Sequence, residues 1–360
     1  MIAYLINIFF IIFWGGVILV PNYSDTRKKV YCIIVTIQWI LISGLRHISV
    51  GPDTYAYKIY RFEKTLQTSW EDLFDNFYNI IILKMDGKDP GYPILEKIFQ
   101  MITPNYQLFL LFIAIFFMVP LGIFVYQYSK RPILSFIIYS CLFYSFFAIT
   151  GHRQTIATGL VLFRGYELIK KRNLFEFLLI IIIGMTIHKS VICLIPFYFI
   201  AHKKITSKYI ISVISTFIFI FIFKNKIMLI ISALVGYEQY GTQFSGAGTP
   251  TFTLFFILIV VAAIYKSKKI LLNDTYYKDR IIWYNALFMA LIYLPLTYVD
   301  PSAMRIVQYF SIFIILLIPE IVSSFKPKEG QIISFIGICL MIILFIRQNP
   351  QYCFFWEGGF

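Results

Sequence analysis

Six charged side chains stand beside apolar runs of the sequence, at positions where a membrane border is expected. They are Arg46, Asp53, Arg153, His188, Arg305 and Arg347. An arginine stays charged and can hold two phosphate oxygens at once, whereas an imidazole or a carboxylate at such a border can accept a proton. Because charges at membrane depth are functional candidates, these residue types predict a site that binds an anion and deprotonates a nucleophile.

Structural roles stay open for each of these residues taken alone. An isolated arginine can extend to the membrane interface or pair with a neighbour. His188 can end a helical arm, and Asp53 can fix the turn after Gly51-Pro52. We expect the set to be functional because all six residues map to one side of the membrane once the topology is drawn.

The elements that position these residues are membrane helices. Of 360 residues, 59% are hydrophobic and only 14% are charged, which is more apolar surface than one core could bury in water. We predict an all-α polytopic integral membrane protein, with residues 1–360 in a single membrane domain of about ten full transmembrane helices plus a broken hairpin. The predicted spans are 2–20, 30–45, 106–128, 133–150, 154–169, 208–224, 251–265, 281–299, 303–322 and 331–347, with the hairpin over 174–201.

The net charge of +14 does not indicate a nucleic-acid partner, because the basic residues lie in short clusters between apolar runs. Such clusters face the cytoplasm. With every cluster placed there, residues 46–105 form a large periplasmic loop and residues 225–250 a second one. The segment 174–201 must then cross an even number of times, but its arms are too short for comfortable spans. We therefore predict a hairpin with His188-Lys189 at its outer tip.

The large loop is predicted to contain two helices. Residues 69–83 have the pattern of an amphipathic helix, with Ser69 as its N-cap and acidic residues in its first turn. Such a helix is expected to lie on the membrane surface. A second short helix is expected over residues 94–102, after the turn formed by residues 90–93.

Several short motifs occur in a fixed order along the chain. They are Gly44-Leu45-Arg46, Val50-Gly51-Pro52-Asp53-Thr54 with Tyr55 and Tyr57, Asp89-Pro90-Gly91-Tyr92, Arg153-Gln154 with Ala157, His188, Met304-Arg305 with Tyr309, and Arg347 to Tyr352. This ordered set resembles the EpsG family of bacterial exopolysaccharide and O-antigen polymerases, the Wzy-like proteins. The chain departs from that pattern at Ile187, where the family usually has an aromatic residue, and at His152, which has no counterpart in it.

The resemblance implies a glycosyltransferase-type polymerase that joins polyprenyl-diphosphate-linked oligosaccharide repeat units at the periplasmic face of the bacterial inner membrane. Its partners would be a lipid-linked donor, a lipid-linked acceptor and membrane lipids, and a chain-length regulator is left open. Because diphosphate is a good leaving group, such an enzyme must neutralise its charge and deprotonate the attacking hydroxyl.

Roles for individual residues follow from those two demands. We assign Arg46, Arg153 and Arg305 to the diphosphate, and His188 or Asp53 to the proton, while the secondary candidates are Tyr57, Lys189 and Arg347. Tyr55, Tyr57 and Trp70 are candidates for stacking on sugars. No cofactor is expected, and no metal, because Mg²⁺ and Mn²⁺ sites for diphosphate need clustered carboxylates, whereas Glu71, Asp72 and Asp75 have the pattern of a solvated helix face.

Three other functions share much of this evidence. A flippase or other transporter of lipid-linked oligosaccharides would have similar spans, but its polar site is expected at the membrane midplane, often between repeated halves. A membrane O-acyltransferase should carry catalytic His and Arg residues early in the chain. An O-antigen ligase takes the same donor, and the sequence does not separate it from a polymerase.

Overall fold

A computed structural model describes residues 1–235, 250–272 and 275–359 of the chain. Regular structure in these ranges is helical, apart from one isolated antiparallel bridge between Arg46 and Phe354. The chain divides into two compact units. Unit 1 contains residues 1–166, 179–189 and 331–360, and unit 2 contains residues 167–178 and 190–330.

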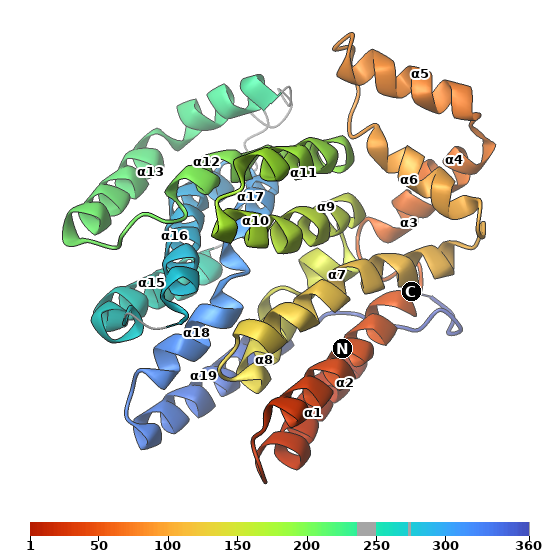
Figure 1. The fold of residues 1–360 in the computed structure, drawn as a ribbon. Coiled ribbons are helices and arrows are strands. Elements are labelled where there is room, and N and C mark those ends of the chain that lie inside the picture. Colours follow the sequence, from red (N-terminus) through yellow and green to blue (C-terminus); the bar gives the residue numbers. More distant parts are fainter. Residues whose placement is uncertain (236–249, 273–274, 360) are drawn as a thin grey trace. The chain divides into compact units, whose positions relative to one another are not determined.

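The antiparallel pair α2 (Asp25–Gly44) and α7 (Tyr106–Tyr128) is the framework of unit 1 (Figure 1). The Tyr126 hydroxyl donates to Asp25 Oδ2 over 2.7 Å at one end of the pair. At the other end a Cβ on Gly44 would come within 2.9 Å of the Leu111 Cα. Small residues let two apolar helices approach this closely, so the pair forms a rigid support for the segment that follows Gly44.

The other elements of unit 1 include short and interrupted helices. They are α1 (Ile2–Trp14) with η1 (Gly15–Leu19), α3 (Thr54–Tyr57), η2 (Lys58–Glu63), α4 (Lys64–Gln67), α5 (Trp70–Ile81), α6 (Gly91–Gln100), α8 (Pro132–Leu142), η3 (Ser145–Ile149), α9 (His152–Thr158), η4 (Gly159–Arg164) and α19 (Pro327–Arg347), of which α19 begins in unit 2. Gly151 has φ +60°, a conformation that glycine adopts at little cost, and it separates η3 from α9.

Both helices predicted in the large loop are present. Helix α5 begins after Ser69, whose hydroxyl accepts from the Asp72 backbone N–H over 3.0 Å, as expected for an N-cap. Helix α6 begins at Gly91, three residues earlier than predicted. Pro90 precedes the first turn of α6 and has the fixed φ of a proline, so the helix can start directly after it.

Unit 2 is built around a buried helix, α16 (Tyr277–Tyr293), which continues into η6 (Leu294–Tyr298). Its other elements are α10 (Gly165–Lys171), which begins in unit 1, α12 (Leu194–Ile200), α13 (Ser207–Val235), α15 (Pro250–Ile270), η7 (Pro301–Ala303), α17 (Met304–Ser311) and α18 (Ile314–Ser323). Helix α13 is kinked at Phe223. The Asn285 side chain of α16 donates to the Ala201 and Lys203 carbonyls, which holds the end of α12.

The segment predicted as a broken hairpin contains α11 (Leu174–Ile187), η5 (Lys189–Cys193) and α12. The regular helix is interrupted at His188, the predicted tip. Within unit 2 the rings of Phe177 and Tyr198 lie 4.9 Å apart, so the chain returns alongside its own start. Of the predicted second loop, 225–250, residues 225–235 belong to α13 and residues 236–249 lie outside the described residues.

The prediction of about ten full spans is wrong. Among the described residues six helices are long and apolar enough to cross a membrane, or seven if one bent pair forms a single span. The six are Ile2–Leu19, Tyr106–Tyr128, Ser207–Ala233, Pro250–Ile270, Tyr277–Tyr298 and Pro327–Arg347. The chain is therefore a polytopic membrane protein with fewer regular spans than its apolar runs indicate.

The missing spans have identifiable causes. The run 133–150 is divided into α8, of 11 residues, and η3, and the run 154–169 is wound partly as the π-helical segment η4. The run 303–322 bends by 53° between α17 and α18. Helix α2 has enough residues, but its first turns carry Asp25 and three basic side chains. Hydropathy alone cannot detect such breaks, because the interrupted segments are as apolar as regular helices.

Candidate functional site

Asp89 is the centre of a polar cluster in unit 1. Its carboxylate forms an ion pair with the Arg153 guanidinium, accepts from the Lys189 backbone N–H over 3.0 Å, and lies 3.6 Å from His188 Nδ1. Asp89 is only 4% exposed and has φ +52°, a left-handed conformation that is uncommon outside glycine. Uncommon backbone conformations of this kind concentrate at functional sites, so the local geometry alone makes Asp89 a candidate.

Close packing of two backbones holds Asp89 in this position. Gly91, in the first turn of α6, lies against Thr186 near the end of α11, and a Cβ on Gly91 would come within 2.3 Å of the Thr186 hydroxyl oxygen. A larger residue would push the two segments apart. The glycine therefore allows the loop that carries Asp89 to reach His188 and Lys189.

A row of aromatic and basic side chains extends from this ion pair to Arg46. Arg153 Nε donates to the Tyr57 hydroxyl over 3.1 Å, and the Tyr57 ring is stacked on His152 with centroids 4.4 Å apart. His152 Nε2 lies 3.0 Å from an Arg46 Nη atom. The row thus connects α9 and α3 with the segment after α2. Its other end, at the ion pair, lies beside the C-terminal end of α11.

Arg46 is fully buried, and it is held by several groups. One of its Nη atoms donates to the Ser43 carbonyl oxygen, and its backbone pairs with Phe354. The C-terminal segment also bonds to this region, since the Tyr352 hydroxyl donates to the Ile42 carbonyl over 2.8 Å. Among the described residues Arg46 forms no ion pair with a carboxylate, so its charge is available to stabilise an anion nearby.

The protonation states in the cluster follow from burial and from neighbouring charges. Burial alone would raise the pKa of Asp89, but His188 and Arg153 lower it below its ordinary value. Burial first, and then the two neighbouring arginines, lower the pKa of His152 well below that of a free imidazole. Asp89 is therefore ionised at neutral pH, and His152 is neutral. Since a guanidinium can only donate, His152 Nε2 accepts from Arg46 and its proton lies on Nδ1.

A second carboxyl group, Glu96, lies close to this row. Its Oε2 accepts from the Thr65 hydroxyl over 3.0 Å, and one turn earlier in α6 the Tyr92 ring packs edge-on against Tyr57 with centroids 5.7 Å apart. Burial raises the pKa of Glu96 to about 8. Glu96 is therefore largely protonated at neutral pH, unlike Asp89.

The structure brings together five of the eight residues predicted from sequence: Arg46, Tyr57, Arg153, His188 and, through its backbone, Lys189. Asp53 precedes α3 with a half-buried side chain, and the contacts that join the cluster pass through Asp89 instead. Arg347 is exposed at the end of α19, and Arg305 lies half-buried in unit 2. The roles of these three residues stay predictions.

Sequence reasoning missed three members of the site. Asp89 was read only as part of a motif, His152 was given no role, and Glu96 was not singled out. The signal for Asp89 was its place before Pro90-Gly91, where an acidic residue begins a turn that must pack closely. Among the described residues no three His, Cys, Asp or Glu side chains converge as a metal site would require.

Comparison with known proteins gives one match. The model of the EpsG family matches residues 29–356, which includes every member of the cluster. No curated protein and no solved structure matches the chain.

Proposed function

Because the chain belongs to the EpsG family, we propose that it polymerises polyprenyl-diphosphate-linked oligosaccharide repeat units into an exopolysaccharide or O-antigen. The reaction would take place at the periplasmic face of the bacterial inner membrane. The proposal is supported by the contacts of Asp89 with both Arg153 and His188, since Arg153 would bind the phosphate and His188 would accept the proton within one site.

In the proposed reaction a hydroxyl of the acceptor sugar attacks the anomeric carbon of the donor's first sugar. A new C–O bond forms, and the bond from that carbon to the diphosphate oxygen breaks, so the electron pair leaves on the polyprenyl diphosphate. The proton of the attacking hydroxyl passes to His188, which Asp89 orients in the manner of the acid that supports a catalytic histidine. The products are a lengthened chain and free polyprenyl diphosphate.

Two arginines of the cluster would have different roles. The Arg153 side chain is 19% exposed, and its fork of donors suits the leaving diphosphate. Arg46 is fully buried and would act through His152 and through its charge. We extend the proposal to Arg305 as a third phosphate ligand, and we keep Asp53 as the alternative base.

The experiment is complementation of a deletion strain, with the surface polysaccharide resolved on a gel. Variants Arg153→Ala, Arg153→Lys and His188→Ala are compared with Arg131→Ala, a control in unit 1 whose guanidinium bonds to Ser334 outside the cluster. We expect single-repeat material from the deletion, a full ladder with the control, and loss of the ladder with the Ala variants at equal membrane levels.

Three other outcomes would contradict the proposal and indicate a different function. Repeat units trapped on the cytoplasmic side would indicate a flippase. An unchanged ladder with lost acylation would indicate an acyltransferase. A ladder that forms but stays on its lipid carrier would indicate a ligase.

A further inference from the structure

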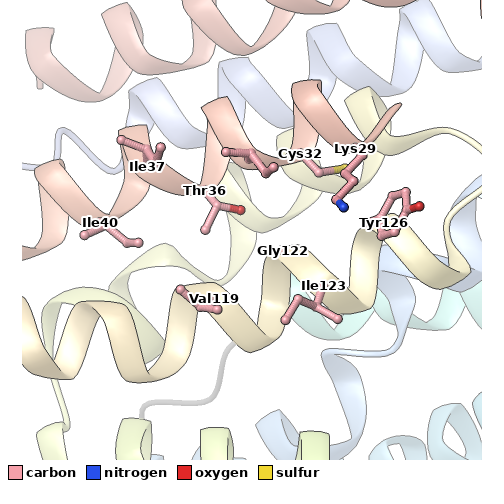
Figure 2. A pocket seen from close by; sticks show the side chains of 10 residues that line it. Lys29, Cys32, Thr36, Ile37, Ile40, Val119, Gly122, Ile123 and Tyr126 are labelled. Atoms are coloured by element: carbon pink, nitrogen blue, oxygen red, sulfur yellow. The ribbon is translucent and has the colours of Figure 1, made fainter. Parts of the chain in front are cut away.

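A groove with a volume of about 210 Å³ lies between α2 and α7 in unit 1 (Figure 2). Its walls are apolar: Ile33 and Ile37 on α2 are both 49% exposed, and Val119 and Ile123 on α7 are 39% and 49% exposed. Helix α7 is one of the candidate membrane spans. Exposed apolar walls along such a helix face hydrocarbon chains rather than water.

The floor of the groove contains a polar group that the protein does not satisfy. A Cβ on Gly122 would lie 2.1 Å from the Thr36 hydroxyl oxygen, so the glycine brings α2 and α7 together below the groove. Thr36 is 93% buried in this floor, since it is 7% exposed, and its hydroxyl has no hydrogen-bond partner among the described residues. A buried hydroxyl without a partner is unfavourable, which indicates that a ligand group can satisfy it.

One end of the groove is basic. Lys29 lines it, and Lys28 lies 5.8 Å from the centroid of the Tyr126 ring, which lines the same end. Arg27 adds a third positive charge against the single negative charge of Asp25, which accepts from Tyr126. A basic rim above an apolar groove is complementary to a lipid with an anionic headgroup.

We propose that this groove binds an anionic glycerophospholipid, with its phosphate at Lys29 and an acyl chain between Ile33–Ile37 and Val119–Ile123. Thr36 lies seven residues beyond Lys29, which is about 10 Å along a helix and suits the ester linkages below a phosphate. The Thr36 side chain lines the groove and its hydroxyl has no partner among the described residues, so this hydroxyl would donate to an ester carbonyl. The proposal does not depend on the polymerase reaction.

The polyprenyl substrate is a poorer occupant of this groove. Lys29 belongs to the first turns of α2, whereas Arg46 lies two residues beyond its last residue, Gly44. The two positions are separated by roughly 25 Å along the helix axis. A lipid held at Lys29 therefore has its headgroup in the leaflet opposite to the polar cluster around Asp89.

The test uses the full-length protein, delipidated in a neutral detergent. Dioleoyl phosphatidylglycerol and dioleoyl phosphatidylcholine are titrated separately, and bound lipid is counted by native mass spectrometry. We expect tighter retention of phosphatidylglycerol, and Lys29→Gln should reduce that preference about fivefold. Lys29→Arg should keep it. Lys268→Gln, which removes an exposed lysine from unit 2, is the matched control.

A second pair of variants tests the groove itself. Val119→Trp should fill the groove and lower retention of both lipids, whereas Ile115→Trp, an exposed position one turn away on α7 outside the lining, should leave retention unchanged. Equal retention of the two lipids, or an unchanged preference in Lys29→Gln, would overturn the proposal. Displacement of phosphatidylglycerol by an equimolar polyprenyl phosphate would also overturn it. If lipid binding is instead lost when the protein changes from monomer to dimer, a second copy of the chain occupies the groove, and the proposal is overturned as well.

Discussion

Unit 1 and unit 2 both bury charged side chains, but they arrange them differently. In unit 2 two cations are each paired with a carboxylate: Lys170 Nζ lies 2.9 Å from Asp279, and Arg280 Nε lies 3.2 Å from Glu320. Arg280 also donates to the Ile270 carbonyl over 3.0 Å. These contacts join α10, α16 and α18, so they are best explained as structural pairs.

In unit 1 the carboxylate of Asp89 is shared by Arg153 and His188, and Arg46 lies against the neutral His152. The cluster thus has more positive than negative charge, and its one ionised acid has an uncommon backbone conformation. Matched buried pairs lock helices together, whereas an excess of positive charge is what an anionic substrate can neutralise. Burial of charge alone therefore does not identify a site, because the balance of charge must also be considered.

The sharpest test of this difference is removal of the proton acceptor from unit 1. His188→Ala should reduce polymer formation on the order of 10²–10⁴-fold, the range for loss of a general base, while the midpoint of thermal unfolding changes little. Asp89→Asn should also reduce the rate, because an amide no longer holds the imidazole as a carboxylate does. Polymer is measured with purified lipid-linked repeat units. Full activity in His188→Ala would assign the proton transfer to another group, with Asp53 the first to examine.

Breaking an ion pair in unit 2 should have the opposite effect: it should lower stability and leave activity per folded molecule unchanged. Glu320→Gln leaves Arg280 without this carboxylate in a buried position, which should cost about 3–5 kcal/mol of stability. Membrane levels and the unfolding midpoint should fall, but activity per folded molecule should persist. Replacing both partners, as Arg280→Met with Glu320→Met, should recover much of the loss. A stable Glu320→Gln variant without activity would instead make unit 2 part of the reaction.

The sequence was sufficient for helices with strong local signals. The 106–128 prediction coincides with α7, and Ser69 caps α5 as its position before two acids indicates. The span count failed because a break in a helix arises from packing and π-helical turns, as at η3 and η4, which have no signature in hydropathy. Local rules therefore find helices and their caps better than they find interruptions.

The candidate site was partly predictable for a related reason. Arg153 and His188 were conspicuous as single charges beside apolar runs. Asp89 was not, because it lies in a loop with several other acids, and its importance depends on a backbone conformation and on contacts with residues about 64 and 100 positions away. Such non-local contacts cannot be deduced from spacing in one sequence.

The stability of the protein should depend on pH because of Glu96 in unit 1. Its pKa is raised from 4.5 to about 8 by burial, so between these values the folded protein binds more protons than the unfolded chain, and stability falls as pH rises. Glu96→Gln should flatten this dependence and stabilise the protein at pH 9 by up to a few kcal/mol. Unfolding midpoints from pH 5 to 9 provide the measurement, with the exposed Glu71→Gln as control. An equal slope in wild type and Glu96→Gln would show that the group ionises freely.

The smallest expected effect concerns the contact that brings Asp89 to the hairpin. Gly91→Ala places a Cβ within 2.3 Å of the Thr186 hydroxyl and 2.8 Å of its Cβ, so the segments must separate at a cost of about 1–3 kcal/mol. Separation would also lengthen the contacts from Asp89 to His188 and Lys189, and activity should fall more than stability does. Gly16→Ala is the matched control, because nothing lies within 4 Å of the added Cβ there. If Gly91→Ala keeps full activity, the ion pair with Arg153 must position Asp89 without help from α11, and Asp89 would then resemble the paired carboxylates of unit 2.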